Sequence, residues 1–340
     1  MDNPVLVEVT RGNIVESRHR GSIAIVDADG KLAFSAGDVE QGIFARSAVK
    51  ALQAIPMVES GAAEALDFDD AELALACASH NGEQVHASSA RIMLFKAGLS
   101  EENLMCGPQW PKHMEDCVSL IKDDETPCQL HNNCSGKHAG FLAMAKTLGI
   151  PTENYIDFDH PVQAEIRNVI EQMSGGILGS DVCGTDGCSI PTYAMEQKKT
   201  ALAFARFGTG VGLDQERAKA AEVLYEACVN EPYMVAGKQR FCTEIMDIFR
   251  GRVFVKTGAE GVFCAALPEL GFGITLKCDD GADRGAEVMM ASTIRSLLTL
   301  SDDEEKGLRS WEHQQLKNRR DILVGEVRPV EDFKRLLKTM

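Results

Sequence analysis

The chain has 340 residues, and 44% of them are hydrophobic, so it can bury a large core as one big domain or two modest ones. Its 35 basic and 51 acidic residues give a formal net charge of −16, and such an acidic surface repels the phosphates of nucleic acids. Collagen-like, coiled-coil and disordered classes are excluded by composition. We expect no nucleic-acid partner.

The first twenty residues carry acids and β-formers where a signal peptide needs a basic segment followed by a continuous apolar one. Apolar stretches elsewhere are broken by charge or glycine well short of the roughly 20 residues of a membrane-spanning helix. Eleven cysteines are an odd number, which favours reduced thiols over a disulfide framework. We therefore expect a cytoplasmic protein with no membrane partner.

The N-terminus is expected to form an antiparallel hairpin or meander. Residues 5–9 and 22–26 are short β-branched runs, and Asp29-Gly30 predicts a turn into a further strand. A helix is predicted from Arg46 to Gly61, because apolar residues recur there at helical spacing. Its opening would present free N–H groups and the positive end of the helix dipole.

The middle of the chain reads as helical and irregular. Two helices are expected within 69–98, on either side of an ACASHNGE loop, and 100–131 is expected to be loop-rich because prolines interrupt it. Residues 174–191 are too rich in glycine for a regular element. Further helices are predicted at about 138–148, 161–173, 191–207, 214–230 and 239–250.

Three strand-like runs follow, at 252–258, 261–267 and 271–278, and then a helix over 284–300. Strands at both ends with helices between them predict an α+β fold, in which one antiparallel sheet is assembled from both ends of the chain around a helical insertion. We expect a single catalytic chain over 1–340. Its sheet lobe would comprise about 1–45 and 250–340, and its helical lobe about 46–249.

Ser47-Ala48-Val49-Lys50 is an S-x-x-K box, which on a helix puts a hydroxyl and an amine one turn apart on the same face. A serine is a weak nucleophile unless a base removes its proton, and an ordinary lysine is protonated at neutral pH. The lysine would have to be desolvated or placed beside another cation. Taken alone, the box is common by chance, and a solvent-facing Ser and Lys on an amphipathic helix is the more frequent interpretation.

Two further boxes follow in order, Ser79-His80-Asn81 after an apolar helix and Lys256-Thr257-Gly258 at the end of a β-run. The order S-x-x-K, S-x-N, K-T-G is that of penicillin-recognising serine enzymes. Ser79 and Lys256 would form a second hydroxyl–amine pair, and two ammonium groups in one pocket would lower each other's pKa. A plain loop and a plain turn are the alternatives for these two boxes.

Two glycine-bearing turns carry one cysteine each, at Cys134 and Cys188. Two thiolates with a third ligand from Lys137 or His138, plus water, would suit zinc, which favours sulfur and nitrogen in tetrahedral geometry. The alternative is a pair of buried, unreactive thiols. The spacing leaves both interpretations open.

These motifs together resemble the Rhizobium etli-type L-asparaginases, the asparaginase II family also called class 3. The resemblance covers nearly the whole chain and includes, in family order, LVEVTRG, ARSAVKALQAIP, ASHNGE, HNNCSGKHAGFL, GTDGCSIPTY, EPYMVAGKQRF, VKTGAEG and NRRDILVGEV. It implies hydrolysis of the side-chain amide of L-asparagine to L-aspartate and ammonia. It also implies a fold similar to serine β-lactamases and glutaminases, and a homodimer.

The resemblance further implies roles for individual residues. Ser47 becomes the nucleophile with Lys50 beside it, and Ser79 with Lys256 becomes the second Ser–Lys pair. A zinc site next to the pocket is implied at Cys134, Lys137 and Cys188. The zinc is expected to help hold the substrate rather than to drive the chemistry, and Lys137 would have to bind it as a neutral amine.

From the chemistry of the reaction, we expect an acyl-enzyme on Ser47 whose oxyanion is met by backbone N–H groups at the helix start and along the Lys256-Thr257-Gly258 strand. The remaining substrate-binding candidates are polar residues close to these motifs. Arg46 is assigned to the α-carboxylate, and Asp186 to the α-ammonium or to the surroundings of the metal. The other candidates are His80, Asn81, Thr257 and Gly258.

Two other classes of protein share some of these features. Another serine β-lactamase-like hydrolase, meaning a glutaminase, β-lactamase or peptidase, would use the same three boxes. A non-catalytic, zinc-stabilised binding protein would need only the cysteines. Activity on nitrocefin would indicate the first, and loss of folding on chelation without amidase activity would indicate the second.

Overall fold

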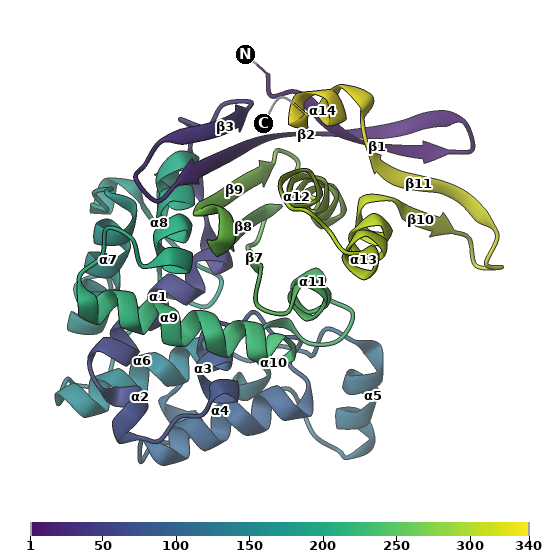
Figure 1. The fold of residues 1–340 in the computed structure, drawn as a ribbon. Coiled ribbons are helices and arrows are strands. Elements are labelled where there is room, and N and C mark those ends of the chain that lie inside the picture. Colours follow the sequence, from purple (N-terminus) through teal and green to yellow (C-terminus); the bar gives the residue numbers. More distant parts are fainter. Residues whose placement is uncertain (1, 339–340) are drawn as a thin grey trace.

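A computed structural model of the protein describes residues 2–338. Its main feature is an eight-stranded antiparallel sheet with the order β10-β11-β1-β2-β9-β8-β7, to which β3 is added by pairing with β2. Figure 1 shows strands from the two ends of the chain, purple and yellow, side by side in this sheet. The strands are β1 Val5–Arg11, β2 Ile14–Asp27, β3 Leu32–Ala36, β7 Phe254–Thr257, β8 Val262–Leu267, β9 Phe272–Cys278, β10 Gln314–Lys317 and β11 Leu323–Pro329.

Most of the helices gather beyond one end of the sheet (Figure 1). They are α1 Lys50–Glu59, α2 Ala62–Ala65, α3 Asp70–Ala76, α4 Gln84–Lys96, α5 Met114–Lys122, α6 Ser135–Leu148, α7 Pro161–Ser174, α8 Gln197–Thr209, α9 Gln215–Asn230, α10 Pro232–Ala236 and α11 Phe241–Phe249. The C-terminal helices are α12 Asp283–Leu297, α13 Asp302–Glu312 and α14 Glu331–Leu337. Both α8 and α12 pack against β9, and one continuous hydrophobic core joins sheet and helices.

The predicted fold class is therefore confirmed in its architecture: an α+β chain whose antiparallel sheet draws its strands from both ends. Strand β2 is much longer than the predicted 22–26. Its first half alternates exposed and covered side chains, whereas positions 21–26 are buried without interruption. The second half is covered on both faces and is therefore a continuous apolar run, which indicates a strand more clearly than the alternating first half does. The prediction accordingly includes only the second half.

The prediction of a helix over 191–207 is wrong for its first six residues. Residues Pro191–Glu196 form strand β6, which pairs with β4 (Gly42–Phe44) and β5 (Cys183–Thr185) in a separate three-stranded sheet. Helix α8 begins only at Gln197. The strand partners of β6 lie far away in sequence or in a glycine-dense turn, so no local pattern indicates a strand here. The helical spacing of the residues after 197 therefore places the predicted helix start too early.

Three other regions differ from expectation. The predicted loop 100–131 contains the helix α5, whose prolines flank it rather than interrupt it. Helix α6 begins at Ser135, three residues before the predicted start, so Lys137 lies in its first turn. No element was predicted after residue 300, where α13, β10, β11 and α14 are found.

Among the helices of residues 2–338, none has the length and apolar character needed to cross a bilayer.

Candidate active site

Two buried lysines converge on one serine. Ser79 follows α3, and its Oγ lies 2.7 Å from Nζ of Lys256 on β7 and 3.0 Å from Nζ of Lys50 at the start of α1. The three residues are 4%, 1% and 1% exposed. Three elements distant in sequence thus bring two of the predicted boxes and the lysine of the third into direct contact.

The amine of Lys50 points toward Ser79 and away from the serine of its own box. Besides Ser79 Oγ, it donates to the carbonyl oxygens of Ala78 at 2.6 Å and Asn133 at 3.2 Å. No hydrogen bond joins Lys50 Nζ to Ser47 Oγ among the described residues. Ser47 is partly exposed, so it is the more accessible of the two serines.

Burial and like charge weaken the basicity of one member of this cluster in particular. Burial, together with the neighbouring Lys50, lowers the pKa of Lys256 from 10.5 to about 7. Its Nζ makes one further hydrogen bond, to the carbonyl of Thr257 at 3.0 Å, and no carboxylate of residues 2–338 pairs with it. Lys256 is therefore the amine that can be neutral near pH 7.

The end of β7 touches the turn that carries Ser47. A Cβ on Gly258 would lie 2.5 Å from the carbonyl oxygen of Ala45 and 3.3 Å from Ala48, so only glycine permits this close approach. The Gly258 N–H is used within the sheet, by Val262 at 2.7 Å. Gly258 thus has a packing role here, and Thr257 beside it remains partly exposed.

The residue before Ser47 has an unusual backbone. Arg46 has φ +51°, a left-handed conformation that non-glycine residues seldom adopt. It opens the short 3-10 helix η1, Arg46–Val49, which leads into α1. Such strain is typical of functional sites, where surrounding contacts maintain it.

His80 and Asn81 are buried and already hydrogen-bonded within the protein. The ring of His80 accepts from the N–H of Gly82 at 3.0 Å and contacts Ser135 Oγ at 3.0 Å, and burial lowers its pKa well below 6.5. The Asn81 amide donates to Glu83 at 3.0 Å and to the carbonyl of Lys238 at 3.0 Å. Both residues brace the Ser79 loop; a direct substrate contact from either stays a prediction.

The predicted zinc ligands lie together at the start of α6 and in the glycine-dense turn. Lys137 Nζ donates to Cys188 Sγ at 3.0 Å, and a hydrogen bond with Cys188 lowers the pKa of Cys134 well below 9.0, helped by Lys50 and Lys137. Burial alone would lower the pKa of Lys137, but the charges of Cys188, Cys134 and Asp186 outweigh it and raise that pKa. All three candidates are buried.

His138 is not placed to substitute for Lys137. Its Nδ1 contacts the hydroxyl of Tyr155 at 2.6 Å, and no His, Cys, Asp or Glu in residues 2–338 forms a three-ligand group with the two thiols. Lys137 is thus the third donor that accompanies Cys134 and Cys188. Zinc prefers sulfur and nitrogen ligands, and two thiols with one amine provide them. Each of the three groups would lose its proton on binding the metal.

Arg46 and Asp186 form an ion pair beside this cluster. Asp186 Oδ2 also lies 3.8 Å from Cys188 Sγ. Burial would raise the pKa of Asp186, but the charges of Lys137 and Arg46 hold it below 3.8. The carboxylate therefore stays ionised and connects the arginine next to Ser47 with the predicted metal ligands.

The two clusters also meet through the residues on either side of Cys134. Lys50 donates to the carbonyl of Asn133, the residue before Cys134, and His80 contacts Ser135, the residue after it. The turn at Cys134 is thereby held between the lysine pair and the Ser79 loop. The Ser–Lys cluster and the thiol cluster form one connected site.

One contributor was not identified from the sequence. Arg240, next to α11, donates to the carbonyl of Ser79 at 3.2 Å and to Oδ1 of Asn81 at 3.0 Å. Its charge also helps to lower the pKa of Lys256. The one sequence signal for Arg240 is its place in the EPYMVAGKQRF segment, which is part of the family resemblance but has no function assigned to it.

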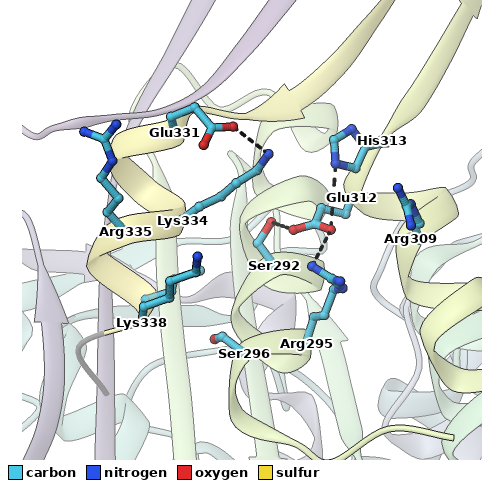
Figure 2. Close-up of a pocket in the computed structure, with 11 residues that line it drawn as sticks. Ser292, Arg295, Ser296, Arg309, Glu312, His313, Glu331, Lys334, Arg335 and Lys338 are labelled. Atoms are coloured by element: carbon cyan, nitrogen blue, oxygen red, sulfur yellow. Dashed lines mark hydrogen bonds and ion pairs between the residues drawn. The ribbon is translucent and has the colours of Figure 1, made fainter.

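A cavity of about 490 Å³ lies elsewhere, between α12, α13 and α14, and contains none of the predicted site residues. Figure 2 shows some of its side chains in pairs: Lys334 donates to Glu331 at 2.9 Å, and Glu312 accepts from Ser292 at 3.1 Å and faces Arg295 at 3.4 Å. This cavity is therefore not part of the candidate active site.

Comparison with known proteins identifies the family of the chain. Fold and site define a mixed α+β protein with a buried serine–lysine centre. A family model described as L-asparaginase II matches residues 7–329, and the chain belongs to this family. Family membership makes the protein an amidohydrolase. No curated protein matches the chain.

Solved structures with limited similarity include Mglu, with 15% identity and a TM-score of 0.36 over 84% of this chain and 69% of that one. A β-lactamase from Mycobacterium bovis has 10% identity and a TM-score of 0.35, covering 86% and 94%. The D-alanine carboxypeptidase AmpC from Burkholderia cenocepacia has 12% identity and a TM-score of 0.37, covering 86% and 92%.

Proposed function

We propose that this protein hydrolyses L-asparagine to L-aspartate and ammonia through an acyl-enzyme on Ser47. The observation that carries the proposal is the contact of Ser79 with both Lys50 and Lys256, in a chain of the L-asparaginase II family. Because the pKa of Lys256 is about 7, the two amines can share one positive charge at neutral pH. The pair can therefore accept a proton.

In the first half-reaction, Ser47 Oγ forms a bond to the amide carbon, and its proton passes to the lysine pair. The pair then returns this proton to the leaving nitrogen as the C–N bond breaks, so that ammonia departs. In the second half, water loses a proton to the same pair and cleaves the ester. Aspartate leaves and the Ser47 hydroxyl is restored.

The N–H of Ser47 hydrogen-bonds no group in residues 2–338, so it is free to stabilise the oxyanion. The Gly258 N–H is occupied by Val262 and the Thr257 N–H donates to Cys242 Sγ, so neither of these two groups is free to act as a second donor. Arg46 and Asp186 offer opposite charges to a zwitterionic substrate. The α-carboxylate would replace Asp186 at Arg46, and the α-ammonium would replace Arg46 at Asp186.

Cys134, Lys137 and Cys188 would hold zinc, which when bound supplies a positive, electrophilic contact for the substrate. The proton now on Lys137 would have to leave, because only a neutral amine can coordinate. Asp186, close to Cys188, would link this cluster to the substrate through Arg46.

The decisive experiment measures ammonia release from L-asparagine and from L-glutamine by the wild-type protein and by Ser47→Ala. We expect rapid release from asparagine and a loss of at least about 1,000-fold in the variant. Ser60→Ala, at the other end of the same helix, is the matched control and should keep full activity. Appreciable turnover by Ser47→Ala would reject the assignment of the nucleophile.

Release from neither amide would leave the Ser–Lys cluster intact but separate it from this substrate. Nitrocefin and short peptides would then be tested, because a β-lactamase or peptidase would use the same groups. Comparable release from both amides would indicate a glutaminase-like specificity. The two substrates differ by one methylene, which a pocket discriminates only modestly.

A further inference from the structure

A second group of metal-ligating side chains lies away from the proposed active site. A ring nitrogen of His19, Sγ of Cys278 and a carboxylate oxygen of Asp280 all lie within 4.8 Å of one another. His19 Nδ1 is 2.6 Å from Asp280 Oδ2, and Cys278 Sγ is 3.1 Å from Asp280 Oδ1. Of all His, Cys, Asp and Glu residues between positions 2 and 338, only these three form such a group.

The fold holds these three residues from different elements. His19 lies on β2 and Cys278 ends β9, and the two strands pair with Gly21 opposite Cys278. Asp280 follows in the turn before α12. A Cβ on Gly285 of α12 would lie 2.8 Å from the His19 ring and 3.0 Å from Cys278 Sγ, so a glycine there lets the helix close over both.

From this geometry we propose that His19, Cys278 and Asp280 bind a divalent transition-metal ion such as Zn²⁺. Nitrogen, sulfur and oxygen donors are the set that zinc accepts, and three protein ligands leave a fourth position for water. A thiolate, a carboxylate and a neutral imidazole also balance a charge of +2. His19 and Cys278 are buried, whereas the Asp280 side chain is 48% exposed, which provides an entry path.

Metal binding requires two proton movements. The Cys278 thiol releases its proton to solvent, and the His19 ring loses a proton at Nδ1 and gains one at Nε2. In the metal-free protein Arg284 Nε donates to His19 Nε2 at 3.1 Å, which places the ring proton on Nδ1, facing Asp280. Arg284 therefore opposes metal binding, but its side chain is exposed and can turn away.

Cobalt is a suitable probe, because a thiolate bound to Co²⁺ gives a charge-transfer band in the near ultraviolet. We would titrate Co²⁺ into a Cys134→Ser/Cys188→Ser background, which removes the thiols of the proposed zinc site. One equivalent should bind and produce the band, and adding Cys278→Ser should abolish it. Cys264→Ser, a buried cysteine on β8, is the matched control and should retain it.

Arg284→Gln sharpens the test. The side-chain oxygen of the new glutamine can accept a hydrogen bond from Nε2–H of His19, which favours the ring form that binds the metal. The substitution should therefore tighten Co²⁺ binding about tenfold. Should the double-serine background fail to fold, Asp280→Asn in the wild-type chain replaces it, and native mass spectrometry should count one bound Co²⁺ fewer. A missing band, a band that survives Cys278→Ser, or an unchanged count in Asp280→Asn would overturn the proposal. None of these readouts depends on amidase activity.

Discussion

Lys256 and Lys137 are both 1% exposed, yet their environments drive their charges in opposite directions. Lys256 faces Lys50 and has no carboxylate partner, so its pKa is lowered to about 7. Lys137 faces Cys188, Cys134 and Asp186, and its pKa is raised despite equal burial. Burial sets the cost of a charge, and the neighbouring charges decide whether the side chain bears it.

The comparison separates the two halves of the site by function. The neutral amine of Lys256 suits proton transfer, whereas the thiol-paired ammonium of Lys137 occupies the place of a cation. One connected site thus contains Lys137, whose pKa is raised, and Lys256, whose pKa is lowered to about 7. Substitutions that change one environment and leave the other intact test this division.

The largest effect is expected for Lys256→Met. Removing the amine that can be neutral near pH 7 should lower kcat at least about 1,000-fold, because the lysine pair then loses the member that accepts the proton. Steady-state ammonia release measures this. Lys146→Met, an exposed position on α6, is the control and should keep full kcat. A Lys256→Met enzyme with a tenth of the wild-type kcat would assign proton transfer elsewhere.

The same substitution should change how stability depends on pH. Above pH 7 the folded Lys256 has lost its proton, while the unfolded lysine keeps its own up to about 10.5. Stability therefore rises with pH across this window, by up to about 1.4 kcal/mol per pH unit, and the contribution is lost as pH falls through 7. Denaturant titrations of both proteins should show the extra slope in the wild type only; parallel slopes would contradict the lowered pKa.

A smaller effect on turnover is expected at the other lysine. Lys137→Met should reduce zinc content to less than about a tenth, because zinc sites in proteins are built from thiolate, imidazole and carboxylate ligands and an uncharged thioether donates more weakly than a neutral amine. KM for L-asparagine should then rise more than kcat falls. His138→Gln, the neighbouring substitution, should retain its zinc, as measured by elemental analysis. Full zinc content in Lys137→Met would show that Lys137 is not a ligand. Loss of zinc in His138→Gln would assign the third ligand to His138.

Prediction from the sequence succeeded where the signal was local. The strands over 252–258, 261–267 and 271–278 are found as β7, β8 and β9, because each is a continuous β-branched or aromatic run between turns. It failed over 191–196, where strand formation depends on pairing with β4 and β5. The helix α5 is absent from the prediction because Pro111 and Pro127, which flank it, suggest a segment without a helix.

The same distinction holds for the candidate site. The three boxes and the two cysteine turns can be recognised without coordinates, and they identify most of the groups available for chemistry. The packing of remote segments brings Lys50 to Ser79 instead of Ser47, adds Lys256 to them, and places His19 beside Cys278, 259 residues away in sequence. Spacing along the chain sets which groups are available. Their pKa and their partners depend on distances and burial, which arise only when remote segments pack together.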